Sequence, residues 1–182
     1  GVTRAADRPV PLEKNLKPFR NQTAYQALIT DKTGEEVTLH ISESDNTRRG
    51  EVDSQSSSIF ELGQHREFAP DVDFVSDQTM LSTTVDDLVE DLDLGPFNFM
   101  NLDLQGAELL ALQGAVKSLE QVDSIYTEVN RAEVYKGCAQ RYQLDQFLSP
   151  LGFQRVQCVW ELNAQTWGDA LYRRTTSMRH GR

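Results

Sequence analysis

The stretch that decides the fold is Phe97-Asn-Phe-Met-Asn-Leu-Asp-Leu-Gln-Gly-Ala-Glu108, followed by Leu109-Leu-Ala-Leu-Gln-Gly-Ala-Val116. This pattern predicts a buried strand, a tight glycine turn and an amphipathic helix. Asp103 lies where the strand should end, and Glu108 lies in the first helical turn. Because open α/β sheets bind ligands just beyond the carboxyl ends of their strands, Asp103 is a candidate site residue.

The predicted elements around this stretch alternate between strands and helices. Thr84 followed by Asp87 is typical of a helix start, and residues 142–148 carry helical spacing. Strands are predicted at 23–30 and 36–41, as the two arms of a hairpin, and at 124–129, 153–160 and 169–173. The alternation favours an α/β fold whose sheet is mostly parallel, with an antiparallel terminal strand pair.

The length of 182 residues favours a single domain. We expect an unstructured start over residues 1–11, one domain over residues 12–173 and a frayed tail over residues 174–182. Residues 42–58 are almost wholly polar, which predicts a long loop.

The amino-acid composition argues against two kinds of binding partner, nucleic acids and membranes. The net charge of −10 disfavours a nucleic-acid backbone, which is bound by clustered Lys and Arg side chains. No apolar run approaches the roughly 20 residues that span a bilayer, so we expect no membrane partner. Two cysteines are too few for a disulfide framework, which favours free thiols in the cytoplasm. The sequence does not indicate the oligomeric state.

Four carboxylates are expected at one edge of the sheet: those of Asp103, Glu108, Glu128 and Asp169. Glu128 ends a strand beside Asp103, and Asp169 begins the closing antiparallel strand. Their repulsion would need a cation, hydrogen-bond donors or raised pKa values to relieve it. Two simpler roles remain open, since Glu108 could only stabilise a helix N-terminus and Asp103 could only cap a turn.

Two further features complete the candidate site. Gly106 permits a positive φ or a close backbone approach. Ser56-Ser-Ser58 in the polar loop could donate hydroxyl hydrogen bonds to a ligand, or could simply lie on the surface. Carboxylate oxygens suit Mg, Ca or Mn, but no pair of histidines has metal-ligand spacing, and we predict no metal ligand.

These residues, in this order and spacing, resemble the FkbM-type S-adenosylmethionine-dependent methyltransferases. The resemblance rests on Asn101-Leu-Asp-Leu-Gln-Gly-Ala-Glu108 with its helix, Ile125-Tyr-Thr-Glu-Val129, Leu151-Gly-Phe153 and Trp167-Gly-Asp-Ala-Leu-Tyr172. It extends back through Ala27-Leu-Ile-Thr-Asp-Lys-Thr-Gly34 and Ser56-Ser-Ser-Ile59, and so covers most of the chain.

The resemblance implies a Rossmann-like sheet, S-adenosylmethionine as cofactor and methyl transfer to a hydroxyl of a small molecule or sugar. Asp103, Gly106 and Glu108 match the family's acid-x-x-Gly-x-Glu signature, and these three with Ser57 are the expected cofactor-binding residues. Asp103 and Glu128 are the expected catalytic residues, and Asp169 is expected to shape the substrate cleft.

The family also carries an upstream Asp-x-Gly-x-x-x-Gly loop and an acid that holds the cofactor ribose. The resemblance places the start of this chain after both, so we expect an N-terminally truncated sheet. Two alternatives follow: a non-catalytic paralogue that acts as a binding module, or a hydrolase whose carboxylates hold a metal.

Overall fold

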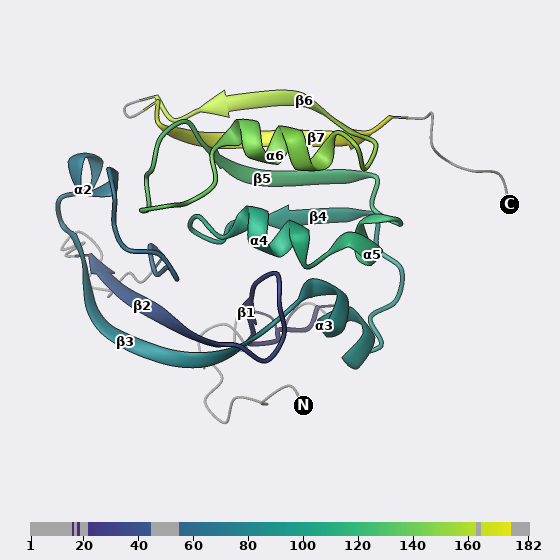
Figure 1. Ribbon diagram of the computed structural model, residues 1–182, viewed down its shortest axis with the longest axis horizontal. Helices are drawn as coiled ribbons and strands as arrows, with labels where there is room; N and C mark the ends of the chain where they lie inside the picture. The colour runs from purple at the N-terminus through teal and green to yellow at the C-terminus, as the bar shows by residue number, and fades with distance from the viewer. Residues whose placement is uncertain (1–15, 17, 19–21, 45–54, 163–164, 176–182) are drawn as a thin grey trace, which may run out of the picture.

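The computed structural model describes residues 16, 18, 22–44, 55–162 and 165–175. Its larger sheet has four strands in the order β4-β5-β7-β6 (Figure 1). The bounds are Phe99–Leu102 for β4, Ser124–Asn130 for β5, Phe153–Trp160 for β6 and Trp167–Arg174 for β7. The fold is therefore α/β, as the sequence predicted.

The pairing within this sheet is mixed rather than mostly parallel. β4 and β5 run parallel, whereas β7 is antiparallel to both β5 and β6. The chain between β4 and β5 forms α4 (Glu108–Gln113) and α5 (Val116–Leu119), which is the crossover that a parallel pair requires. The short connection from β6 to β7 allows only antiparallel pairing, and the predicted antiparallel terminal pair is confirmed.

The second sheet has three strands in the order β1-β3-β2, with bounds Leu28–Ile29 for β1, Glu36–Ser44 for β2 and Val72–Thr83 for β3. The predicted hairpin between residues 23–30 and 36–41 is wrong. β1 pairs parallel to β3 and β2 pairs antiparallel to it, so β3 separates them. The sequence pattern did not predict β3 as a long strand, because most of its middle residues, such as Asp77 and Gln78, are polar and exposed.

The predicted polar loop is shorter than expected. Residues 42–44 continue β2, and Ser58 forms an isolated antiparallel bridge with His40. Both Ser42 and Ser58 are buried, so this polar segment packs against the ribbon of β2 and β3. Residues 45–54, the predicted start at 1–11 and most of the predicted tail lie outside the described residues.

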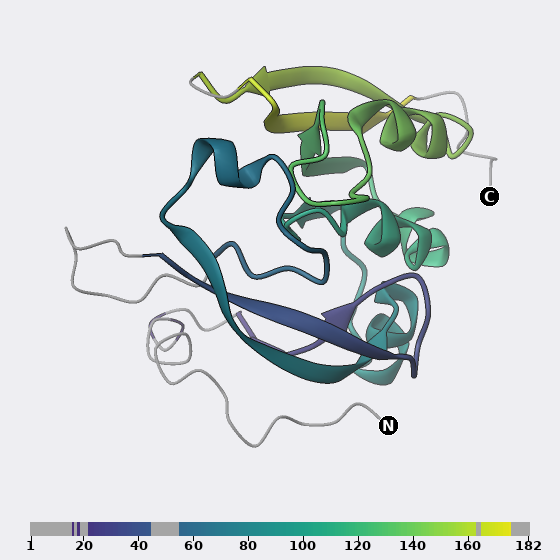
Figure 2. The same cartoon turned by 60° about the vertical axis from the view of Figure 1, so that its left-hand side comes forward.

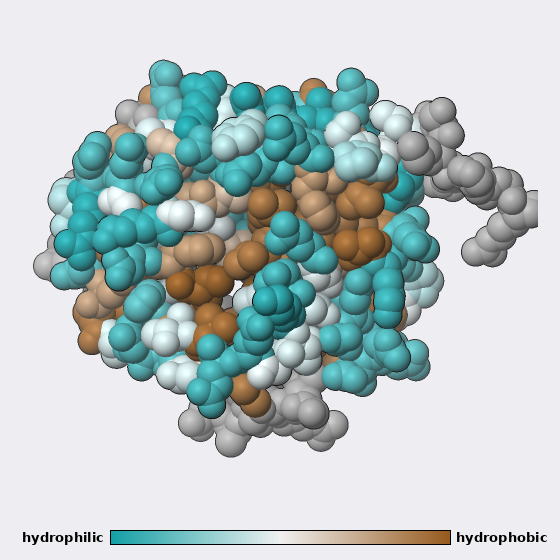
Figure 3. Space-filling view, viewed as in Figure 1, coloured by the Kyte–Doolittle hydropathy of each residue, from teal (hydrophilic) through white to brown (hydrophobic). Residues whose placement is uncertain are grey.

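The main hydrophobic core lies between one face of the four-stranded sheet and α4, α5 and α6 (Arg141–Leu148). Its most buried members are Ala111, Leu112, Ala115, Val122, Ile125, Leu148 and Ala170. Figure 3 shows further apolar side chains in the band between α6 and α4. On the opposite face of the sheet, Phe99 and Tyr126 remain exposed.

The two sheets meet at α3 (Val85–Asp91), whose N-cap Thr84 accepts a hydrogen bond from the Asp87 backbone as the sequence predicted. The Asp86 carboxylate accepts hydrogen bonds from the backbone amides of Lys117 and Ser118 at the start of α5. Figure 2 shows the β2–β3 ribbon lying apart from the four-stranded sheet.

No helix within the described residues is long and apolar enough to cross a membrane.

Candidate functional site

The site begins with the turn that follows β4. Gln105 has φ of 51° and Gly106 has φ of 101°, so two successive residues adopt left-handed backbone geometry. One carboxylate oxygen of Glu108, Oε1, accepts hydrogen bonds from the Leu104 amide at 2.8 Å and the Gly106 amide at 3.2 Å. Glu108 therefore fixes the turn from within, and it is only 2% exposed.

Glycine is required at position 106 for two reasons. A positive φ is costly for a side chain with a Cβ. A Cβ built there would also lie 3.0 Å from the Cβ of Cys138 and 3.3 Å from ring carbons of Phe60 and Tyr135. The predicted positive φ at Gly106 is confirmed, together with a close approach.

Side chains from two other segments, those of Ser58 and Tyr135, hold the turn in place. The Tyr135 hydroxyl donates to Gln105 Oε1 at 2.7 Å, and Gln105 Nε2 donates to Asp103 Oδ1 at 2.5 Å. The Ser58 hydroxyl donates to the Gln105 carbonyl at 2.7 Å. Asp103, which is exposed, is thereby held at the carboxyl end of β4.

Glu128 lies at the end of the neighbouring strand, half-buried, and its register partner on β7 is Asp169. Burial raises the pKa of the Glu128 carboxyl to about 8, helped by the negative charges of Glu108, Asp103 and Asp169. Burial also raises the pKa of Glu108. The four carboxylates that the sequence placed at one sheet edge thus act on one another electrostatically.

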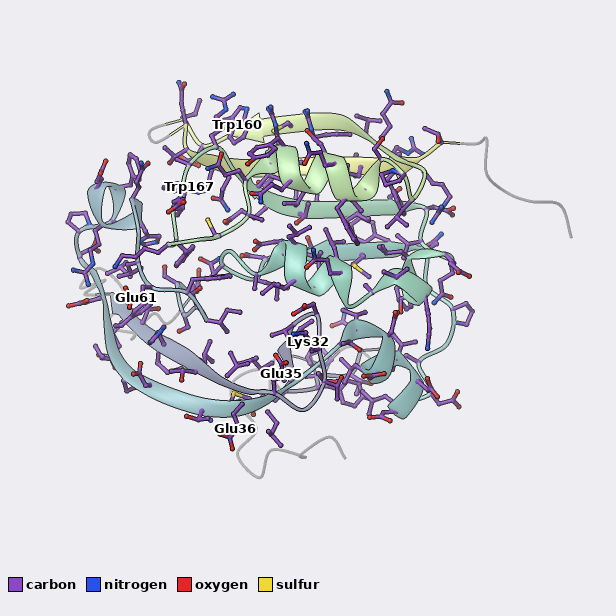
Figure 4. The ribbon with its side chains drawn as sticks, in the orientation of Figure 1. Lys32, Glu35, Glu36, Glu61, Trp160 and Trp167 are labelled. Carbon is purple, nitrogen blue, oxygen red and sulfur yellow. The ribbon has the colours of Figure 1, made fainter. Side chains whose placement is uncertain are left out.

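A pocket of about 380 Å³ opens beside these groups, and we call it the β4–β5 pocket. Its described walls are Gln55, Ser56, His65, Asp103, Gln105, Glu128, Val134, Tyr135 and Trp167. Trp167, labelled in Figure 4, packs edge-on against Phe68 of α2 (His65–Phe68) at 5.6 Å between ring centroids. Burial lowers the pKa of His65, which favours its neutral form.

The predicted site residues fall into two groups. Asp103 and Glu128 line the pocket. Glu108 and Gly106 lie behind the turn, Asp169 lies next to Glu128, and the Ser57 hydroxyl accepts from the Ser42 amide. The cofactor and substrate contacts predicted for these residues stay predictions.

Sequence reasoning did not identify Gln105, His65, Tyr135 or Trp167 as pocket residues. Tyr135 reaches the site from a loop that pairs with Leu62 through one isolated bridge, and nothing in the local pattern indicates that pairing. Trp167 did carry a signal, because it precedes the predicted strand with Asp169. Within the described residues, no group of three His, Cys, Asp or Glu side chains is arranged to hold a metal.

The fold and the site define a class: an α/β protein whose polar, acidic pocket lies at the carboxyl ends of two parallel strands. A family model described as the methyltransferase FkbM domain matches residues 8–155. The chain therefore belongs to the FkbM methyltransferase domain family, as the sequence resemblance indicated. Comparison with curated proteins found no match, and comparison with solved structures found none.

Proposed function

We propose that this protein transfers a methyl group from S-adenosylmethionine to a hydroxyl oxygen of a small molecule, in the β4–β5 pocket. The observation that carries the proposal is the position of Glu128, a carboxyl with a raised pKa at the end of β5 beside an open pocket. Family membership supports methyl transfer as the chemistry. The hydroxyl acceptor, which includes sugars, is the finer part of the proposal.

The donor groups of the pocket suit the positively charged end of this cofactor. Asp103 and Glu128 supply negative charge, and no Lys or Arg is among the described lining residues. Asp103 would lie beside the sulfonium, with Gly106 and Glu108 shaping the turn that carries it. Ser57, close to the lining residue Ser56, is the remaining predicted contact.

Glu128 is the proposed general base. When bound, S-adenosylmethionine supplies a methyl group on a positively charged sulfur that leaves as a neutral thioether. Glu128 would accept the proton of the acceptor hydroxyl as that oxygen takes up the methyl group. A base whose pKa lies near the working pH is well suited to this transfer. A bound positive charge nearby would lower the Glu128 pKa and favour the carboxylate form.

The remaining side chains would position the reactants. The Tyr135–Gln105–Asp103 chain of hydrogen bonds keeps Asp103 at a fixed place, and Asp169, opposite Glu128 on the adjacent strand, adds negative charge that helps to raise the Glu128 pKa. Fixed polar groups lower the barrier because they need little reorganisation during the reaction.

We further propose that the four-stranded sheet is part of a Rossmann-like methyltransferase sheet and that residues 12–173 form one domain. The exposed face with Phe99 and Tyr126 supports this, because helices normally cover both faces of a Rossmann-like sheet. The thiols of Cys138 and Cys158 are unpaired, which is consistent with the cytoplasm.

The first test is calorimetric titration of the 182-residue chain with S-adenosylhomocysteine. We expect micromolar binding, about tenfold weaker binding by Asp103→Asn and unchanged binding by Glu120→Gln, because Glu120 is an exposed residue at the C-terminal end of α5 and does not line the pocket. A folded sample that gives no binding would contradict the proposal and favour the non-catalytic binding module.

A further inference from the structure

We propose that two copies of this chain associate face to face through the side of the four-stranded sheet that is turned away from α4, α5 and α6. We call this side the open face. It carries Tyr126, Leu171, Asp169 and Arg173 near its centre, with Phe99 and Val159 toward its margins. The inference goes beyond the proposed function, because it concerns the assembly of the protein and not methyl transfer.

Large apolar side chains on the open face are exposed to solvent. Phe99 of β4 is 54% exposed, Val159 of β6 is 56% exposed and Tyr126 of β5 is 39% exposed. Helices α4, α5 and α6 pack against the opposite face, around residues such as Ile125 (Figure 1). An apolar surface that reaches across several strands is typical of a protein–protein contact, because association removes it from water. A second copy would supply this cover.

The charge of the open face changes sign along the strands. Arg173, Leu171 and Asp169 occupy alternate positions of β7, so their side chains lie on the same face. In the register with β5, Leu171 is opposite Tyr126 and Asp169 is opposite Glu128. The open face is therefore basic at one end, apolar across its middle and acidic at the other end.

The two charged residues of β7 cannot pair within one chain. Arg173 and Asp169 are four residues apart on an extended strand, which separates their Cα atoms by about 14 Å. Arg173 is exposed, and no carboxylate among the described residues forms an ion pair with it. Asp169 is also exposed, and its carboxylate accepts a hydrogen bond from the Tyr126 hydroxyl. Both charges are therefore available to a partner.

A single two-fold axis brings these opposite charges together. The axis lies between the two copies, at right angles to the strands, and passes over Tyr126 and Leu171. It places the apolar middle of one open face against the same residues of the other and reverses the strand direction. Arg173 then lies opposite Asp169 of the partner subunit, and the symmetry repeats this pair. Stacked sheets are rotated by about 30°, which displaces the margins more than the central strands β5 and β7.

The size of the open face determines how strong the association should be. Four strands spaced about 4.8 Å apart, each contributing about five residues of 3.4 Å, give a small contact surface. This is at the lower end of the area that specific protein pairs bury. We therefore expect a reversible dimer with a dissociation constant of about 10 µM rather than a permanent one.

The test is sedimentation velocity of the full chain at concentrations from about 1 to 200 µM. We expect the wild type to change from monomer to dimer within this range. Arg173→Glu and Asp169→Arg should each weaken the association at least tenfold, because each homodimer then contains two like-charge pairs. An equimolar mixture of the two variants should associate within about threefold of the wild type, because the mixed dimer again pairs opposite charges at both places.

The matched controls make the same charge changes away from the open face. Lys117→Glu and Glu120→Arg alter exposed residues at α5 and its C-terminal end, and each should associate like the wild type. Circular dichroism checks that every variant is folded. A wild type that stays monomeric at 200 µM would overturn the proposal. So would controls that lose association as strongly as the open-face variants, a mixture that stays monomeric, or growth beyond two copies, since the two-fold axis closes the assembly at two.

Discussion

Glu128 on β5 and Asp169 on β7 are register partners, so two carboxylates lie directly opposite each other on antiparallel strands. Side chains in such positions have Cβ atoms about 4.5–5.5 Å apart, and like charges there are destabilising. Burial of Glu128, together with the negative charges of Glu108, Asp103 and Asp169, raises its pKa and so stabilises the protonated form. This relationship links the stability of the fold to pH.

The folded protein should lose stability as the pH rises through the range of about 5 to 8. The Glu128 pKa in the folded state, about 8, lies above its usual value of 4.5, so the folded state holds the proton more tightly across this interval. The unfolding free energy therefore falls with rising pH, by up to roughly 1.4 kcal/mol for each pKa unit. Urea unfolding at several pH values should show a flatter profile for Glu128→Gln than for the wild type.

Glu61→Gln is the matched control for this pH profile. Glu61 is exposed, and its hydrogen bond to Lys136 lowers its pKa below the usual 4.5, so this carboxyl is charged in both the folded and the unfolded state between pH 5 and 8 and adds no slope there. The prediction fails if Glu61→Gln flattens the profile as much as Glu128→Gln does.

Removing the Glu108 carboxylate should destabilise the turn after β4. Glu108→Ala leaves the Leu104 and Gly106 amides without an acceptor, at a cost of roughly 2–4 kcal/mol for one partly buried and one buried donor. Glu108→Gln keeps an acceptor oxygen and should cost about 1 kcal/mol or less. Chemical denaturation measures both. An equal loss in the two variants would show that the hydrogen bonds do not explain the stability of the turn.

Two glycines with positive φ separate backbone strain from crowding. Gly137→Ala, with φ of 77° and open space around it, should cost only the left-handed strain of about 1–2 kcal/mol. Gly106→Ala should cost about 1–3 kcal/mol more, because its Cβ would meet Cys138, Phe60 and Tyr135. Melting temperatures compare the pair, and similar losses would argue against close packing at Gly106.

The sequence predicted the elements that carry strong local signals. The strand at 99–102, its turn and helix, the Thr84 cap, the helix at 142–148 and the final strand pair were all expected and are all present. The crowding of Asp103, Glu108, Glu128 and Asp169 was also predicted, because parallel strands end at the same sheet edge. Family membership followed from the same motifs.

Other features depend on contacts between distant segments. β3 is a long strand whose polar residues face solvent, so its sequence lacks the apolar alternation that identifies strands. Without β3, the adjacent segments 23–30 and 36–41 were paired with each other. Tyr135 and His65 reach the pocket from segments with irregular backbone or a single helical turn, and no periodic pattern marks such residues.

The hydrogen bonds from the Lys117 and Ser118 amides to Asp86 join the first turn of α5 to α3, the helix that follows β3 of the other sheet. Gly114 also lies at this contact, packed so closely that a Cβ there would be 2.4 Å from the Thr30 carbonyl oxygen. The rate at which these two amide hydrogens exchange with deuterated solvent therefore measures how often the sheets separate. Slow exchange at Lys117 and Ser118 would show that the two sheets unfold as one cooperative unit. Rapid exchange confined to these amides would show that the contact between α5 and α3 opens locally.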